Sequence, residues 1–209
     1  MFVVPSRPVL LERLPRLLFG LTLCGVGIAL MVAADLGLGP WDVLHQGVSE
    51  QVGIPIGTVG ILVGFVVLLA WLPMRQRMGI GTVVNVLWIG VTIDLVLLVL
   101  DTPDATALRW VYLAVGAFLF GPGSGFYIGA GLGPGPRDGL MTGIARRGYT
   151  VRNVRTGIEL TVLAIGWLLG GSVGIGTVLF ALTIGPNVHY FLDRLSLPEW
   201  SEPAVTGAP

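Results

Sequence analysis

ADLGLGPWDVL at residues 34–44 and AGLGPGPRDGL at residues 130–140 are two copies of one motif, and they decide the fold of this chain. Seven of their eleven positions are identical. Self-similarity at a fixed offset is the signature of a duplicated structural unit. The chain is therefore predicted to contain two related halves.

The repeat extends beyond this motif in both directions. Upstream, three glycines of the first half match three of the second: Gly20, Gly25 and Gly27 align with Gly116, Gly121 and Gly123. Downstream, GIGT at 79–82 recurs at 174–177, and IG at 89–90 recurs at 184–185. Matches that keep their order and nearly one offset favour duplication over chance glycine richness.

Composition indicates an integral membrane protein whose main partner is the lipid bilayer. Of the 209 residues, 54% are hydrophobic and 11% charged, and the mean hydropathy is +0.85. Soluble domains carry about 25% charged residues. The apolar residues also form blocks of about 20, the length that crosses the hydrocarbon core. The formal net charge is zero, so no nucleic-acid partner is expected.

The apolar blocks predict an all-α membrane protein with about six transmembrane helices. They cover residues 16–34, 55–73, 80–100, 109–130, 153–171 and 174–192. Because each half holds three spans, an odd number, the second half must begin on the opposite side of the membrane. The prediction is two inverted three-helix repeats, each with a short interfacial or re-entrant helix, at 40–52 and 136–147.

This pattern divides the chain into five parts. They are an N-terminal segment (1–15), a first three-helix repeat (16–100), a linker (101–108), a second three-helix repeat (109–192) and a tail (193–209). The tail is expected to be disordered from about Leu197 onward because it is rich in proline and small residues.

The distribution of arginine along the chain predicts how the protein is oriented in the membrane. The chain has 12 arginines and no lysine. If the N-terminus is cytoplasmic and six spans follow, every arginine except Arg109 falls on the cytoplasmic side. Since positive residues favour cytoplasmic loops, we expect a multi-pass protein of the inner, or plasma, membrane with both termini in the cytoplasm.

Four stretches carry a resemblance to a known family. They are GIALM at 27–31, LGLGPWDVL at 36–44, GPGPRDGLMTG at 133–143 and VRTGIEL at 154–160. Together they resemble the YczE/YitT-like family of bacterial integral membrane proteins over residues 10–195. The resemblance implies an all-helical inner-membrane protein and assigns no catalytic residue.

The paired motifs supply the main candidates for a substrate pathway. Glycine suits the N-cap and proline the first turn of a helix. One interpretation is a pair of half-helices that enter from opposite faces and meet at the repeat interface; the other is two interfacial helices capped by aspartate. The candidates are Gly39, Pro40, Asp42, Gly135, Pro136, Arg137 and Asp138. Their mixed charges leave the charge of the cargo open.

Two acidic residues inside predicted spans complete the set of candidates. A charge at this depth costs about 2.5–3.5 kcal/mol unless it is paired or hydrated. Asp94, in the third span, has no partner nearby in the sequence. Glu159, in the fifth, follows Arg155 by four residues, so the two are expected to pair on one helix face.

The sequence favours a small-molecule or ion transporter with a pathway between the repeats. The alternative is a non-transporting scaffold or accessory protein for a biosynthetic or export complex, and the small size suits a homodimer or a protein partner. Ser124 in the fourth span and His189 in the sixth resemble the arrangement of rhomboid proteases, but the residues before Ser124 read PG where that family has glycine first. We expect no enzymatic activity, no cofactor and no metal site.

Overall fold

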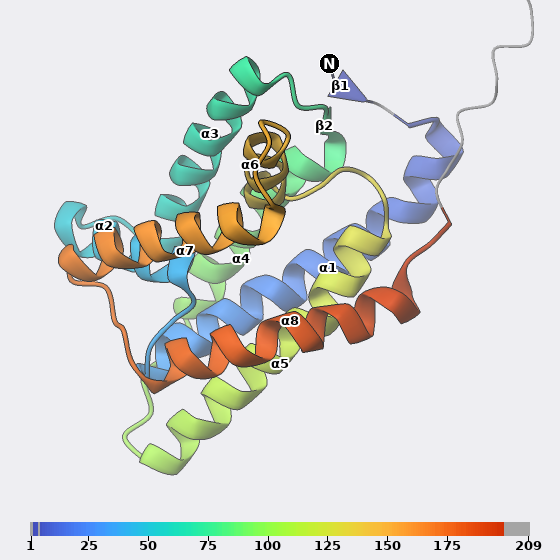
Figure 1. Cartoon of the computed structure of the whole chain (residues 1–209). Coiled ribbons are helices and arrows are strands. Elements are labelled where there is room, and N and C mark those ends of the chain that lie inside the picture. The colour runs from blue at the N-terminus through green and yellow to red at the C-terminus, as the bar shows by residue number, and fades with distance from the viewer. Residues whose placement is uncertain (1, 4, 199–209) are drawn as a thin grey trace, which may run out of the picture.

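The computed structural model describes residues 2–3 and 5–198, and within these the chain forms eight α-helices and one pair of very short strands (Figure 1). The helices are α1 (Arg7–Ala34), α2 (Pro40–Val52), α3 (Ile56–Met74), α4 (Ile80–Leu97), α5 (Thr106–Gly129), α6 (Pro136–Ala145), α7 (Val151–Leu168) and α8 (Ile175–Leu195). The strands β1 (Phe2–Val3) and β2 (Met78–Gly79) pair in parallel.

The all-α class predicted from the sequence is confirmed, and a helix lies at each predicted span and at both predicted short helices. Five helices, α1, α3, α4, α5 and α8, are long and apolar enough to cross a membrane. The helix at 153–171, α7, is not among them; it carries Arg152, Arg155 and Glu159. Most of the tail for which disorder was expected, residues 199–209, lies outside the described residues.

The long helices turn large apolar side chains outward. On α3, Leu62, Val66, Leu69 and Leu72 are each more than half exposed. A soluble protein rarely exposes a continuous apolar surface of this kind. Such a surface can face lipid, because the side chains are apolar and an α-helix satisfies its own backbone hydrogen bonds without water. The outer surface therefore agrees with the membrane class that the composition predicts.

Glycines allow α1 and α5 to cross in close contact at the centre of the bundle. A Cβ placed on Gly27 would lie 2.7 Å from the Gly116 carbonyl oxygen, and one on Gly116 would lie 2.6 Å from that of Gly27. The same relation joins Gly20 and Gly123. The paired positions run in opposite order along the two helices, so α1 and α5 are antiparallel. Small residues at such crossings let helix backbones approach closely.

The loops that precede the short helices make matching contacts. The Gly81 amide donates to the Leu132 carbonyl at 2.8 Å, and the Gly176 amide donates to the Leu36 carbonyl at 2.8 Å. In each loop the next residue is a glycine in the left-handed region, Gly133 with φ 127° and Gly37 with φ 105°. Only glycine adopts this conformation without strain. The contacts of one loop are thus repeated in the other with the halves exchanged.

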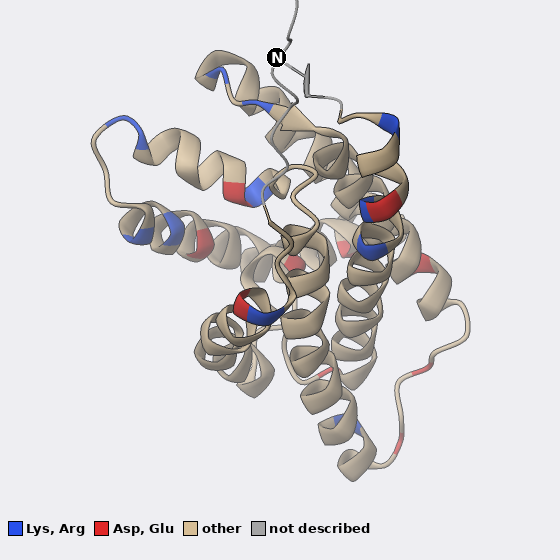
Figure 2. Cartoon of the chain, turned by 90° about the vertical axis from the view of Figure 1, so that its right-hand side faces the viewer, with Lys and Arg blue, Asp and Glu red and all other residues tan. Residues whose placement is uncertain are grey.

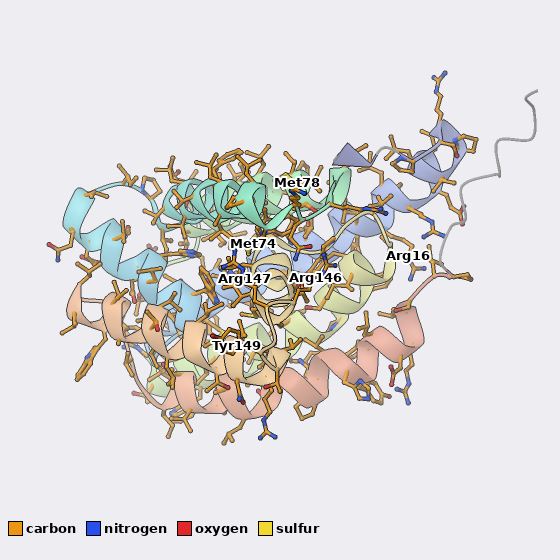
Figure 3. The ribbon with its side chains drawn as sticks, turned by 45° about the horizontal axis from the view of Figure 1, so that its top comes forward. Arg16, Met74, Met78, Arg146, Arg147 and Tyr149 are labelled. Atoms are coloured by element: carbon orange, nitrogen blue, oxygen red, sulfur yellow. The ribbon has the colours of Figure 1, made fainter. Side chains whose placement is uncertain are left out.

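The two loops lie at opposite ends of the bundle. Near the start of α1, the Arg13 guanidinium donates to the Ala130 carbonyl at 3.0 Å. Beyond the other end of α1, Asp35 lies 3.6 Å from Arg109. The first end also gathers most of the cationic residues, in the upper half of Figure 2. Figure 3, in which this end is tilted forward, shows Arg16, Arg146 and Arg147 on it.

The short helices α2 and α6 lie in the interior between α3 and α7, and each packs against both. Exposure along α2 rises from its first residues, where Trp41 and Asp42 are 6% and 4% exposed, to Glu50, which is fully on the surface. The N-terminus of α2 therefore points into the bundle and its C-terminus points out. This arrangement brings the first turns of α2 and α6 together.

Candidate functional site

A cavity of about 380 Å³ lies where the first turns of α2 and α6 meet. Of the nine pathway candidates named from the sequence, eight line it: Gly39, Pro40, Asp42, Gly135, Pro136, Arg137, Asp138 and Glu159. Its volume is at the lower end of the range for small-molecule pockets. The fold thus collects residues from both halves of the chain around one space.

Glycine and proline set the start of both short helices, as the sequence predicts. Gly39 and Gly135 are the N-cap residues, with extended backbone, and Pro40 and Pro136 begin the helices. Proline is favoured there because its missing N–H would have no helical partner. The residues that follow, Trp41 and Asp42 on α2 and Arg137 and Asp138 on α6, therefore lie on the cavity.

Arg137 connects the two helix tips. Its guanidinium carbon lies 5.0 Å from the centre of the Trp41 ring, and its Nη2 lies 3.5 Å from Asp42 Oδ1. Stacking on an aromatic face stabilises a guanidinium by about 0.5–2 kcal/mol. Trp41 and Arg137 are also equivalent positions of the repeat. A contact between equivalent positions is expected where a two-fold axis passes between the halves.

Asp42 is the buried carboxylate of the site. Besides Arg137, it contacts His45 Nδ1 at 3.5 Å, and the His45 side chain is itself 6% exposed. Both contacts are longer than the 2.7–2.9 Å of a strong charge-assisted hydrogen bond. A buried carboxylate without close partners is costly, so Arg137 and His45 together stabilise it.

Two further acidic groups line the cavity with different partners. Asp138 is exposed, and its Oδ2 accepts from the Tyr127 hydroxyl at 3.4 Å. Glu159 accepts from Arg155 Nε at 2.8 Å, which confirms the pairing predicted from their spacing. Glu159 is therefore locally compensated, whereas the contact of the Asp138 carboxylate within the described part of the chain is a long one with a neutral hydroxyl.

Asp94 is the one candidate that does not lie on the cavity. Its Oδ1 accepts from the Gly57 amide at 2.6 Å and its Oδ2 accepts from the Thr58 hydroxyl at 2.7 Å. Both donors belong to the first turn of α3, where backbone N–H groups lack helical partners. Asp94 thus caps α3 from the neighbouring helix α4.

Several lining residues were not included among the pathway candidates. Trp41, His45, Asn85 and Tyr127 all line the cavity. Trp41 and His45 share the short helix of Asp42, which was a usable signal; Asn85 and Tyr127 come from long helices α4 and α5. Within the described residues, no group of three or more His, Cys, Asp or Glu side chains is arranged to hold a metal ion.

Ser124 and His189 both line the cavity, but their surroundings differ. Ser124 is 6% exposed on α5. The His189 side chain is 80% exposed on α8 and contacts Asp193 at 3.5 Å. A serine nucleophile needs its base within about 3.2 Å. The cavity therefore contains both residue types without the burial pattern of a paired dyad.

Part of the cavity lining is exposed at the surface, and that part belongs to the second half of the chain. Its lining includes exposed residues of α6, α7 and α8, namely Asp138, Arg155 and Gly185. A Cβ on Gly185 would meet nothing within 4 Å. Helices α7 and α8 both lie within the described residues, and they do not form a packing interface comparable to that between α3 and α4.

The matching contact in the first half is closed. Gly90, equivalent to Gly185, touches Gly57 so closely that a Cβ on it would lie 2.4 Å from the Gly57 carbonyl oxygen. The Asp94 cap holds the same helix pair together. The two halves therefore differ: α3 and α4 are packed, whereas α7 and α8 are apart.

An all-α bundle with an apolar outer surface and five candidate spans defines the chain as a multi-pass integral membrane protein. The chain belongs to the family of unknown function DUF6198, whose model matches residues 11–193.

Curated relatives agree with this assignment. An uncharacterized protein of Haemophilus influenzae is 41% identical over 181 residues, covering 86% of this chain and 83% of the relative. The uncharacterized membrane protein YczE of Bacillus subtilis is 35% identical over 183 residues, with the same coverage. The uncharacterized protein YyaS of the same organism is 25% identical over 181 residues, covering 83% of this chain and 89% of the relative. No solved structure matches the chain. The YczE-like family identified from the sequence is thereby confirmed.

Proposed function

We propose that this protein is a permease-like carrier of a small solute or ion, with its pathway between two inverted halves. The observation that carries the proposal is the cavity at the meeting point of α2 and α6, lined by charged residues from both halves. Helix tips that enter from opposite sides and meet at a repeat interface are a recurrent construction of secondary transporters.

The reciprocal contacts support the inverted repeat. Two sets of contacts between the halves, Gly27 with Gly116 and Gly81 with Leu132, each have a partner contact in which the halves are exchanged. A two-fold axis near Trp41 and Arg137 explains these pairs. In this proposal α7 is the fifth of six spans, and its Arg155 and Glu159 line the cavity rather than face lipid.

The difference between the halves supports alternating access. A symmetric bundle can open at α7 and α8 while α3 and α4 are closed, and exchange these states without a change of fold. The arginine-rich end, which holds both Arg16 and Arg146, would face the cytoplasm under the positive-inside rule. Both termini would then be cytoplasmic, in the inner or plasma membrane.

The test is flux into proteoliposomes that contain the purified full-length chain. Amino acids, organic acids, amines and inorganic ions are offered in turn to the wild type and to Asp42→Ala, Asp138→Ala and Arg137→Gln. Flux of at least one class is expected, and we expect each variant to reduce it about tenfold or more. Asp101→Asn, in the α4–α5 connection away from the cavity, is the matched control and should retain flux.

No flux in any class, together with stable copurification of another protein, would favour a scaffold or accessory role instead. Equal flux in all three variants would also contradict a pathway through this cavity. We infer no catalysis at this site, because Ser124 is buried while the His189 side chain is 80% exposed. Labelling of Ser124 by a fluorophosphonate would overturn that inference.

A further inference from the structure

We propose that the cavity binds a small zwitterion, such as an amino acid with an apolar side chain. The inference rests on the proposed permease function and names the chemical class of its substrate. It starts from two oppositely charged residues at the tip of α6, Arg137 and Asp138, which both line the cavity. Each has capacity for a further partner.

Arg137 has donors to spare. A guanidinium has five N–H groups, and the hydrogen-bond contact of Arg137 within the described residues is one long approach, 3.5 Å, to Asp42. Its side chain is 34% exposed toward the cavity. A carboxylate matches the fork of a guanidinium and accepts two parallel hydrogen bonds from it. Arg137 is therefore suited to bind the carboxylate end of a ligand.

Trp41 provides an independent indication of a ligand. Trp41 is 6% exposed, yet its indole Nε1–H has no hydrogen-bond partner among the described residues. A buried donor left unpaired costs about 1–3 kcal/mol, and native proteins rarely tolerate one. Trp41 lines the cavity and its ring lies 5.0 Å from the Arg137 guanidinium carbon, so this unpaired donor belongs to a residue of the same site.

Asp138 provides the opposite charge. Its exposed carboxylate has one long contact, with the Tyr127 hydroxyl. The other carboxylates of the cavity are more fully compensated, Asp42 by Arg137 and His45 and Glu159 by Arg155. Asp138 is therefore the group best placed to accept from a ligand ammonium.

The remaining surface disfavours ions that carry a single sign of charge. A simple anion would lie near three carboxylates, and a simple cation would lie near Arg137 and Arg155. The lining also includes apolar residues, among them Phe120 and Phe180, whose rings are in edge-to-face contact at 5.0 Å. A molecule with both charges and a small apolar body satisfies each of these groups.

The experiment measures binding, separately from flux, with sets of molecules of nearly equal shape. Purified full-length protein in detergent is titrated with leucine, 4-methylpentanoate and isopentylamine, and with the matching acids and amines of alanine and phenylalanine. Binding is read from thermal stabilisation and from tryptophan fluorescence. We expect at least one amino acid to bind about tenfold more tightly than its acid or its amine.

Variants then assign the two ends. Arg137→Gln should weaken binding of the amino acid and binding of the matching acid alike, by about tenfold or more. Asp138→Asn should weaken binding of the amino acid and of the amine but not of the acid, so that the preference for the amino acid over the matching acid falls toward one. Arg109→Gln, at the far end of the bundle, is the matched control and should leave the preference unchanged.

Each outcome bears on one proposal. Acids or amines that bind as well as the amino acid, or a panel in which none binds, would overturn the zwitterion inference. Amino acid binding without any flux would leave the zwitterion inference intact and contradict the proposed permease function. Flux of a simple ion without amino acid binding would support the permease and overturn the inference.

Discussion

Asp94 illustrates how a charged residue in a candidate span can serve structure. Its carboxylate caps the first turn of α3 through Gly57 and Thr58. Loss of such a cap costs about 0.5–2 kcal/mol, or roughly 1–8 °C in melting temperature for a chain of this size. We predict that Asp94→Ala lowers the melting temperature of the purified protein by such an amount, measured by differential scanning fluorimetry.

Asp94→Asn retains an acceptor and should lose less stability. Asp104→Ala, in the exposed α4–α5 connection, is the control and should have the melting temperature of the wild type. An Asp94→Ala variant that melts normally but changes which solute is bound would show that Asp94 belongs to the pathway after all.

At the residue scale, the sequence predicts contacts between residues close in the chain but not contacts between residues far apart in it. The helix starts at Pro40 and Pro136, and the Arg155–Glu159 pair, follow from neighbours in the sequence. The stacking of Arg137 on Trp41 joins residues almost half the chain apart. Nothing in the sequence around either residue fixes how the two tips meet.

At the scale of the helix, the crossing of α1 and α5 depends on glycine. A Cβ on Gly116 would lie 2.6 Å from the Gly27 carbonyl oxygen, so the two helices would have to move apart. Overpacking of this kind costs about 1–3 kcal/mol. We predict that Gly116→Ala lowers the melting temperature and the yield of monodisperse protein in size-exclusion chromatography.

Gly157 on α7 is the matched control for this substitution. It is also a helical glycine, but a Cβ there would meet nothing within 4 Å. Alanine in an open helical position is favoured over glycine by up to about 1 kcal/mol, so Gly157→Ala should melt at or above the wild-type temperature. Similar losses in both variants would show that the crossing itself does not limit stability.

The packed state of α3 against α4 leads to a prediction about movement. A Cβ on Gly64 would lie 3.4 Å from the Val86 Cβ, close to the separation of about 3.5–4.5 Å in a disulfide. In a Cys24→Ala background, which removes the only cysteine, Gly64→Cys with Val86→Cys should cross-link under mild oxidation. If α3 and α4 must separate during transport, the cross-link should abolish flux and a reductant should restore it.

The single-cysteine variants control for the substitutions themselves. A second pair, Thr156→Cys with Gly185→Cys, spans α7 and α8 of the second half, which are apart in this structure. Its cross-linking should be slow and should accelerate when substrate is added. Full flux through the cross-linked Gly64–Val86 variant would contradict movement of α3 against α4.

For the whole molecule, the sequence predicts the elements better than their arrangement. The offset of the two motifs, the apolar blocks and the arginine distribution together predict a membrane bundle built from related halves. They do not indicate that α7 and α8 are apart while α3 and α4 are packed, because both halves carry the same GIGT and IG stretches. In the proposed carrier, which half opens would depend on a small free-energy difference between two packings, and such a difference leaves no pattern in one chain.

The orientation of the halves gives the last prediction. Glu50 and Arg146 are equivalent positions of the repeat, both exposed, at the outer ends of α2 and α6. In an inverted repeat they face opposite sides of the membrane. In the Cys24→Ala background, a membrane-impermeant maleimide should label Glu50→Cys in intact right-side-out vesicles. It should label Arg146→Cys only after permeabilisation, because arginine-rich ends stay in the cytoplasm. Ser172→Cys, beside Leu38 at the end that holds α2's loop, should follow Glu50→Cys. Labelling of both Glu50→Cys and Arg146→Cys from one side would mean that the halves are not inverted, and a pathway between them would lose its physical basis.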